Sequence, residues 1–267
     1  MEHERSHFLS HVRNLVVKLG TQLLSDAQGR LDAPFLAQIA GQVAALRQRR
    51  IQVTIVSSGA IGAGLRELNL PRRPRDLAVL QAVAAVGQRR LMDAWAAAFA
   101  PHKLPVAQLL LTREDIDSRA RFLNVRNTVQ QVHELGGVPI INENDTISTD
   151  ELTRISFGDN DILAALVAHA MQTNLLVLLT VVDGVLDAQG RPVRLVQNLA
   201  EAGELVRKEK SALGTGGMNS KLEAAAMVTS AGEAMVVANG RDADVLLRIL
   251  DGKEVGTLFA PRARRSS

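Results

Sequence analysis

Short apolar segments alternate along the chain with longer amphipathic ones. The short segments are rich in Val, Ile and Leu, and they cover residues 15–19, 51–56, 105–111, 138–141, 175–182 and 235–238. Strands that are buried on both faces read as continuous apolar runs of this kind. The Ala-rich amphipathic segments predict helices near residues 33–50, 75–100, 119–135, 160–172, 198–208 and 219–231. The pattern predicts an α/β fold, a three-layer αβα sandwich with a mainly parallel central sheet.

The segments at the two ends are polar and are expected to be tails, 1–13 and 261–267. Between them, residues 14–260 are expected to form one domain with two lobes, 14–173 and 174–260, that meet near Gln172–Leu175. His3, His7 and His11 are spaced four apart and could share a helix face that binds a metal. We interpret this segment instead as a mobile tail, because nothing nearby supplies a further ligand.

Composition excludes several classes of protein. The chain has 267 residues, a formal net charge of +3 and no cysteine, so disulfides, thiolate metal sites and cysteine nucleophiles are excluded. The arginines in PRRPR (72, 73 and 75) and in the last residues (262, 264 and 265) are interpreted as a solvated loop and a frayed end rather than an RNA groove. The N-terminus lacks a signal-peptide core, and the longest apolar run is too short to span a bilayer. We therefore predict a cytoplasmic protein without nucleic-acid or membrane partners.

The segment from Val138 to Leu163 carries the densest polar cluster. Asn142 to Asp145 follow a predicted strand, and Gly158 to Asp161 stand at the head of a predicted helix. Carboxylates and amides at this density are costly to bury unless something pairs with them, and in α/β proteins such strand ends are where ligands bind. The segment is therefore predicted to form the floor of a site for a small charged ligand.

Three further clusters follow strands or precede helices. Lys18 lies in an apolar strand end, where either an anionic partner or a snorkelling edge position would explain it equally well. The run 57–64 (SSGAIGAG) reverses the dinucleotide fingerprint, and its glycines allow either close approach of a ligand or only a tight turn. The run 214–221 (GTGGMNSK) differs from a Walker A loop, and phosphate binding is favoured over a merely flexible loop.

Taken together and in order, these blocks resemble those of the glutamate 5-kinases, a branch of the amino acid kinase family. The blocks are VVKLGT, SSGAIGAG, AAVGQRRLMDAW, QLLLT, RFLNVRNT, VPIINENDTIS, FGDNDILAA, LLTVVDG, GTGGMNSK and VGTLF, and they cover nearly the whole chain from Leu15 to Phe259. AAVGQ, NEND and FGDND point to the glutamate enzyme rather than to kinases of aspartate, carbamate or uridylate. The resemblance implies the amino acid kinase fold and ATP-dependent phosphorylation of the γ-carboxylate of L-glutamate, the first step of proline synthesis.

The resemblance also implies roles for particular residues. Lys18 and Lys221 would flank the transferring phosphoryl group, and Asp161 would hold both lysines. The residues expected to bind glutamate are Ser58, Gly59, Ala60, Asn142, Asp145, Asp159 and Asn160. Those expected to hold the nucleotide, besides Lys18, are Thr180, Val181, Thr215, Gly216, Gly217, Met218, Asn219, Ser220 and Lys221. ATP and Mg²⁺ are the implied cofactor set, with no metal ligand assigned among the residues.

The expected chemistry needs no base. A glutamate side chain has an unperturbed pKa of about 4.3, so the nucleophile is already ionised at neutral pH. The difficulty is to bring one anion to another and to stabilise charge in the transition state, which lysines, helix-start amides and Mg²⁺ can do.

Two departures from the family pattern stand out. Val181 occupies the position after Thr180 where the family commonly has Asp, and the chain continues past VGTLF only as APRARRSS, so no RNA-modification-type (PUA) domain is expected. The resemblance further implies proline as a feedback inhibitor, a homo-oligomer (dimer or tetramer) and handover to a glutamyl phosphate reductase. Two alternatives stay open: a related kinase with a different acceptor, and a weakly catalytic amino-acid sensor, for which Val181 is the only sequence support.

Overall fold

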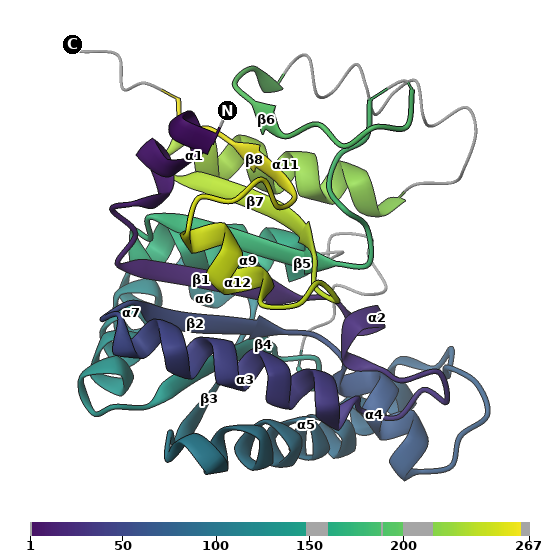
Figure 1. The fold of residues 1–267 in the computed structure, drawn as a ribbon. Helices are drawn as coiled ribbons and strands as arrows, with labels where there is room; N and C mark the ends of the chain where they lie inside the picture. The colour runs from purple at the N-terminus through teal and green to yellow at the C-terminus, as the bar shows by residue number, and fades with distance from the viewer. Residues whose placement is uncertain (1, 148–159, 188, 200–215, 263–267) are drawn as a thin grey trace.

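The computed structural model describes residues 2–147, 160–187, 189–199 and 216–262, and the central element of these parts is a single eight-stranded sheet (Figure 1). Its strands lie in the order β3-β4-β2-β1-β5-β7-β8-β6. The strand bounds are β1 Asn14–Leu19, β2 Gln52–Ser57, β3 Val106–Leu111, β4 Val138–Glu143, β5 Leu175–Thr180, β6 Leu195–Val196, β7 Ala234–Asn239 and β8 Thr257–Phe259.

Every neighbouring pair of strands runs parallel except β7 and β8, which are antiparallel. The prediction of an α/β fold with a mainly parallel sheet is confirmed, and each of the six predicted strands is present. The two strands that the pattern missed, β6 and β8, have only two and three residues. Segments this short give no recognisable apolar run.

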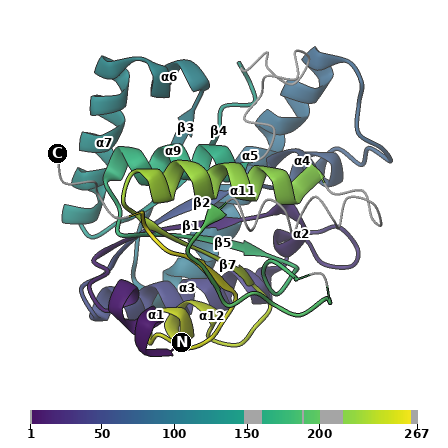
Figure 2. The same ribbon diagram turned by 90° about the horizontal axis from the view of Figure 1, so that it is seen from above.

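Helices cover both faces of the sheet (Figure 2). One face packs against α1, α3, α5 and α12, and the other packs against α6, α7, α9 and α11. The helix bounds are α1 Glu2–Leu9, α2 Thr21–Leu24, α3 Ala33–Gln48, α4 Ala60–Glu67, α5 Leu77–Phe99, α6 Arg113–Asp117, α7 Arg119–Glu134, α9 Asn160–Met171, α11 Gly216–Ser230 and α12 Val245–Leu250, with a short 3₁₀ helix η1 at Ala100–His102. The predicted helix near 198–208 lies almost wholly outside the described residues.

Alternation along β1 decides which way its lysine points. Leu15, Val17 and Leu19 belong to the core beneath α3 and α5, whereas Val16 belongs to the core beneath α9 and α11. Side chains two positions apart in a strand share a face, so Lys18 points with Val16 toward α9 and α11. Lys18 is only 4% exposed, which rules out the snorkelling edge position.

The prediction of a tail at residues 1–13 is wrong in part, because residues 2–9 form α1. Leu9 and Val12 are buried in the core, and the Arg5 side chain is fully buried. Arg5 Nη1 donates to the carbonyl oxygen of Arg194 at 2.7 Å, and Nη2 donates to that of Val255 at 2.6 Å. The polar sequence of residues 2–9 shows no apolar face from which a docked helix could be predicted. The helix is held instead by Arg5, whose guanidinium donates to two backbone carbonyl oxygens. The helix ends at Leu9, so His11 does not continue it in line with His7.

Strand β5 is shorter than predicted. The prediction ran to residue 182, but β5 ends at Thr180, whose carbonyl oxygen accepts a hydrogen bond from the Gly240 N–H at 2.8 Å. Val181 and Val182 follow the strand and are 45% and 40% exposed. Gly184 then turns the chain at a φ of 128°, a conformation that glycine adopts without strain. Within the described ranges, no helix is both long enough and apolar enough to cross a bilayer.

Candidate functional site

The predicted site residues gather at one edge of the sheet because the central strands are parallel. Parallel strands end on the same side, so the carboxyl ends of β1, β2, β4 and β5 lie next to one another. Lys18 precedes the end of β1, Ser58 follows β2, Asn142 lies near the end of β4, and Thr180 ends β5. The amino end of α9 brings Asn160 and Asp161 to the same edge.

A buried aspartate joins two lysines that are far apart in the sequence. Lys18 Nζ lies 2.6 Å from Asp161 Oδ1, an ion pair rather than a well-aligned hydrogen bond. Lys221 Nζ donates to Asp161 Oδ2 at 2.9 Å, and Ser220 Oγ donates to the same oxygen at 3.1 Å. Asp161 has no exposed surface. The structure therefore brings together the three residues to which the sequence assigned catalysis.

The balance of charge in this cluster is positive. Two ammonium groups face one carboxylate, which leaves a net charge of +1 in a place almost closed to water. Coulomb attraction at such a site is much stronger than in bulk water, because the surroundings are less polarisable. Removing either lysine would leave one full ion pair in place, whereas removing the aspartate would leave two ammonium groups in mutual repulsion. The cluster is therefore suited to hold an anion between the lysines.

A second cluster consists of amides and a hydroxyl. Asn160 Nδ2 donates to Ser58 Oγ at 2.8 Å, to Asn142 Oδ1 at 3.1 Å and, more weakly, to the carbonyl oxygen of Ser57 at 3.3 Å. Asn142 Nδ2 donates in turn to Gln88 Oε1 at 2.8 Å. Three of the residues predicted to bind glutamate, Ser58, Asn142 and Asn160, are therefore in direct contact.

The turn after β2 is held by close packing of two helices. Gly59 has a φ of 101° and precedes α4, whose first residue, Ala60, is buried. A Cβ added at Gly87 in α5 would lie 1.8 Å from the carbonyl oxygen of Ala60 and 2.3 Å from the backbone nitrogen of Gly64. Helices α4 and α5 therefore meet backbone to backbone, and this contact fixes the direction in which Ser58 and Gly59 enter the site.

The helix predicted over 219–231 begins three residues earlier than expected, within the glycine-rich run. Helix α11 begins at Gly216, so Gly216 to Lys221 form its first turns, and Thr215 lies outside the described residues. Asn219 is exposed, whereas Met218 and Ser220 are partly buried. The first backbone N–H groups of a helix have no partner within it, which suits them to phosphate oxygens. Thr180 and Val181 lie at the end of β5, one strand away from Lys18.

Two predicted carboxylates contribute less to this description. Asp145 follows β4 in a turn and is partly buried, and Asp159 lies outside the described residues.

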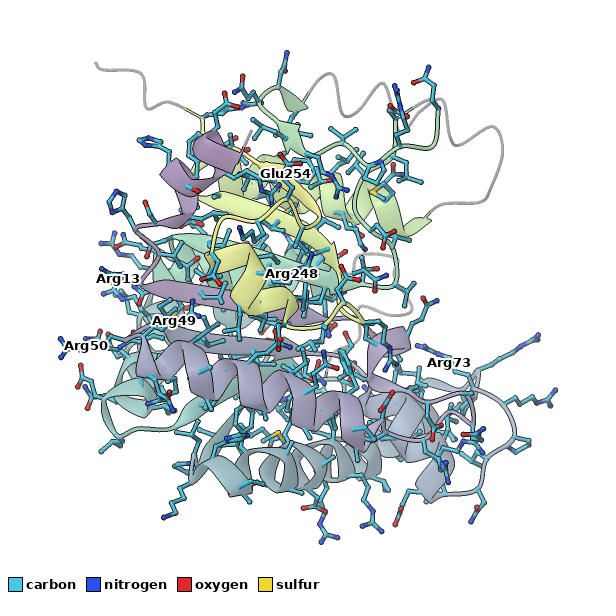
Figure 3. The ribbon with its side chains drawn as sticks, viewed as in Figure 1. Arg13, Arg49, Arg50, Arg73, Arg248 and Glu254 are labelled. Carbon is cyan, nitrogen blue, oxygen red and sulfur yellow. The ribbon has the colours of Figure 1, made fainter. Side chains whose placement is uncertain are left out.

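The arginine cluster at 72, 73 and 75 is an exposed loop after α4, as expected. Figure 3 shows Arg73 at the carboxyl edge and Arg13, Arg49 and Arg50 at the opposite edge, where β1 and β2 begin. Arg73 and the other three arginines therefore lie at opposite edges of the sheet.

Sequence reasoning missed the residues that support this site from behind. Gln88 and Trp95, both in α5, are buried, and Trp95 Nε1 donates to Ser57 Oγ at 3.1 Å. Gln88 completes the amide cluster through Asn142. The signal for both residues was the AAVGQRRLMDAW block, which supported the resemblance without indicating a role for either.

The chain is similar to known proteins over most of its length. A model of the amino acid kinase family matches residues 13–239. A glutamate 5-kinase from Geobacter sulfurreducens is 45% identical over 264 residues, which cover 96% of this chain and 70% of that protein. A glutamate 5-kinase from Thermus thermophilus is 45% identical over 262 residues, covering 94% and 68%. This chain belongs to the glutamate 5-kinase branch of the amino acid kinase family.

Two solved structures share the fold of this amino acid kinase at low sequence identity. Carbamate kinase from Giardia lamblia bound to AMP-PNP superposes with a TM-score of 0.65 at 17% identity, over 95% of this chain and 100% of that one. N-acetylglutamate synthase from Neisseria gonorrhoeae, complexed with coenzyme A and N-acetyl-glutamate, gives a TM-score of 0.66 at 18% identity, over 98% of this chain and 62% of that one. At such identities the comparison supports the fold alone.

A separate cavity of about 340 Å³ lies at the amino edge of the sheet, away from the predicted site of this amino acid kinase. Thr54, Arg126 and His133 are among its lining residues. His133 is buried, and its Nε2 lies 2.9 Å from Thr54 Oγ1, whereas Nδ1 has no hydrogen-bond partner among the described residues. Burial, together with the nearby positive charge of Arg47, lowers the pKa of His133 to about 4.

A buried carboxyl group titrates in the opposite sense. Burial raises the pKa of Glu233 to about 7, and its Oε2 has no hydrogen-bond partner among the described residues. Between pH 4.5 and 7 the unfolded chain therefore binds fewer protons at this position than the folded protein does, so this group's stabilising contribution falls as pH rises. At His133 the unfolded chain binds more protons than the folded protein between pH 4 and 6.5, so the contribution of His133 to the free energy of unfolding rises with pH. The two effects oppose each other over most of this range.

Glu233→Gln should therefore be more stable than the parent protein at pH 7 and lose this advantage on acidification. We expect the difference in free energy of unfolding between variant and parent to shrink by about 2 kcal/mol from pH 7 to pH 5, at 1.36 kcal/mol per pKa unit. Urea unfolding at the two pH values measures it. Glu114→Gln, which changes an exposed carboxylate, is the matched control for the loss of one negative charge. A constant difference for Glu233→Gln would contradict the prediction.

Proposed function

We propose that this protein transfers the γ-phosphoryl group of ATP to the γ-carboxylate of L-glutamate, forming L-glutamyl 5-phosphate and ADP. In the family to which the chain belongs, this reaction is the first step of proline biosynthesis. The observation that carries the proposal is the convergence of Lys18 and Lys221 on Asp161 at the carboxyl edge of the sheet. Two cations held by one buried acid suit a reaction between two anions.

In the proposed reaction one carboxylate oxygen forms a bond to the γ-phosphorus, and the bond from that phosphorus to the oxygen bridging to the β-phosphate breaks. The glutamate carboxylate is ionised at neutral pH, so no residue has to remove a proton. Lys18 and Lys221 stabilise the charge on the transferring group and on the leaving ADP. Asp161 keeps both ammonium groups in place by direct contact.

On the glutamate side, the contacts of Ser58, Asn142 and Asn160 support their assignment as a substrate-binding group. Gly59 and Ala60 offer backbone groups at the turn into α4. Asp145 is proposed to bind the α-ammonium group, together with Asp159.

On the nucleotide side, we assign the phosphates to the first turns of α11. The residues of α11 concerned are Gly216, Gly217, Met218, Asn219, Ser220 and Lys221. Thr215, which lies outside the described residues, is proposed to bind the phosphates with them, and Thr180 with Val181 would contact the nucleoside part. Both Asp161 oxygens face lysines, and no cluster of three or more His, Asp or Glu side chains suited to a metal occurs in the described part of the chain. Mg²⁺ therefore enters the proposal as part of the substrate MgATP, where it binds phosphate oxygens.

Trapping with hydroxylamine tests the proposed function. Acyl phosphates react with hydroxylamine to give hydroxamates, which iron(III) converts into coloured complexes. We expect hydroxamate with L-glutamate, ATP and Mg²⁺ together, and none when any one of them is omitted. Aspartate and N-acetylglutamate serve as alternative acceptors. Product with one of these and none with glutamate would redirect the proposal to another acceptor, and the absence of any product would support the amino-acid sensor.

Further features of the proposal rest on family membership alone. They are proline as a feedback inhibitor near the glutamate site, assembly as a dimer or tetramer, delivery of the unstable acyl phosphate to a glutamyl phosphate reductase, and action in the cytoplasm, where ATP and glutamate are available. The first three have their own measurements: inhibition by proline, molar mass by light scattering, and co-elution with the reductase.

A further inference from the structure

A chain of side-chain amides leads from helix α5 into the proposed glutamate site. It starts at Gln88, passes through Asn142 to Asn160 and ends at Ser58, with donor–acceptor distances between 2.8 and 3.1 Å. Gln88 is 8% exposed and Asn142 is 3% exposed, so water cannot easily replace these partners. Gln88 itself lies beside Gly87, at the point where α4 and α5 touch.

The direction of every amide in this chain follows from one carbonyl group. The carbonyl oxygen of Ser57 can only accept, so the group of Asn160 that faces it must be Nδ2. Because Asn142 also faces this nitrogen, it must present Oδ1 there, and its own Nδ2 then points at Gln88. Gln88 completes the sequence by presenting Oε1. A reversed amide at any step would place two donors or two acceptors against each other.

This arrangement determines what Asn160 can offer a ligand. Its Nδ2 has two hydrogens, which Ser57, Ser58 and Asn142 already share as acceptors. Its Oδ1 has no hydrogen-bond partner among the residues that the structure describes. Asn160 is therefore set to accept a hydrogen bond from a ligand rather than to donate one.

We propose that Gln88 is a positioning residue that holds Asn142, and through it the amide of Asn160, in this direction. The site thereby selects a substrate carrying an N–H donor, such as the α-ammonium group of an amino acid. The inference rests on the proposed function and adds a determinant of its specificity. Without an acceptor at position 88, the buried Nδ2 of Asn142 loses its partner, and a buried donor without a partner is costly. Asn142 can then turn over, which brings its NH₂ group against that of Asn160. Asn160 relieves this contact by turning as well, because its bond to the carbonyl oxygen of Ser57, at 3.3 Å, is the longest of the three that Nδ2 makes.

The test compares two substrates that differ at one group. In (S)-2-hydroxyglutarate a hydroxyl replaces the α-ammonium of L-glutamate, and a hydroxyl can accept a hydrogen bond where an ammonium group cannot. We expect Gln88→Met to lower the preference for glutamate over hydroxyglutarate, as a ratio of kcat/KM values, at least tenfold. Gln88→Glu should keep the preference, because its carboxylate still accepts from Asn142. Arg89→Met, an exposed neighbour on α5, is the matched control and should leave the ratio unchanged.

The outcomes separate the two proposals. If the parent protein phosphorylates neither compound, the proposed function fails. If the parent protein phosphorylates glutamate and the preference in Gln88→Met stays within twofold of the parent value, the role of Gln88 is overturned while the function stands. Thermal unfolding of each variant verifies folding. Should Gln88→Met not fold, Gln88→Asn takes its place, because its amide is one methylene too short to reach Asn142, and the same loss of preference is expected.

Discussion

Replacing Lys221 with methionine should lower kcat for glutamate phosphorylation by about 10²–10³-fold, the loss typical when one group that stabilises transition-state charge is removed. The KM for glutamate should change only a few-fold, because the glutamate-binding cluster around Asn160 does not include Lys221. The fold should tolerate the change, since Asp161 keeps its ion pair with Lys18 at 2.6 Å. Steady-state kinetics of ADP release at saturating ATP measure both constants.

Lys103→Met is the control for this prediction. Lys103 is exposed in the loop after α5, so its loss should leave both constants near those of the parent protein. If kcat and glutamate affinity fell equally in Lys221→Met, the lysine would contribute to ground-state binding, and its assigned role would be wrong.

Gly87→Ala should destabilise the protein by at least about 3 kcal/mol, which is at the upper end for overpacking. The added methyl group would lie 1.8 Å from the carbonyl oxygen of Ala60, and that atom belongs to backbone that cannot rotate away. The higher helix propensity of alanine, about 1 kcal/mol, offsets only part of this cost. For a chain near this size the midpoint of thermal unfolding should fall by roughly 6 °C or more. The KM for glutamate should rise too, because α4 carries the turn at Ser58 and Gly59.

Gly62→Ala is a matched control within α4. A Cβ added at Gly62 meets no atom within 4 Å, and the position is helical, so alanine should be neutral or slightly stabilising. Calorimetry of the two variants and the parent protein makes the comparison. Equal midpoints for Gly87→Ala and the parent protein would mean that α4 and α5 separate at little cost.

The sheet was predictable because its central strands are buried on both faces. Runs such as LLVLLT at β5 leave no other interpretation once glycine and polar turns bound them. The N-terminal helix was not predictable in this way. Its first residues are polar, and its anchorage depends on Arg5 reaching carbonyl groups of Arg194 and Val255, which no local pattern encodes. Strands β6 and β8 were too short to leave a pattern.

The sequence predicted some residues of the site and missed the role of others for a related reason. Lys18 on its own was compatible with two explanations, and only its contact with Asp161, 143 positions away, decides between them. The glycines before residue 219 were expected to belong to a loop, but glycines at a helix start are compatible with helical backbone, and α11 begins at Gly216. Gln88 could not be given a role, because a buried glutamine in an amphipathic helix resembles any other polar residue until its partner is known.

The anchorage of α1 has a consequence for biosynthesis. Arg5 lies in α1, yet one of the two oxygens that accept from its guanidinium belongs to Val255, 250 positions later in the chain. During synthesis α1 therefore cannot make this contact until Val255 has been added to the chain, even though domains begin to organise from their N-terminal end as they are made. A nascent chain halted before Val255 would carry α1 without this anchor, and we expect α1 to be cleaved more readily by proteases there than in a chain that includes Val255.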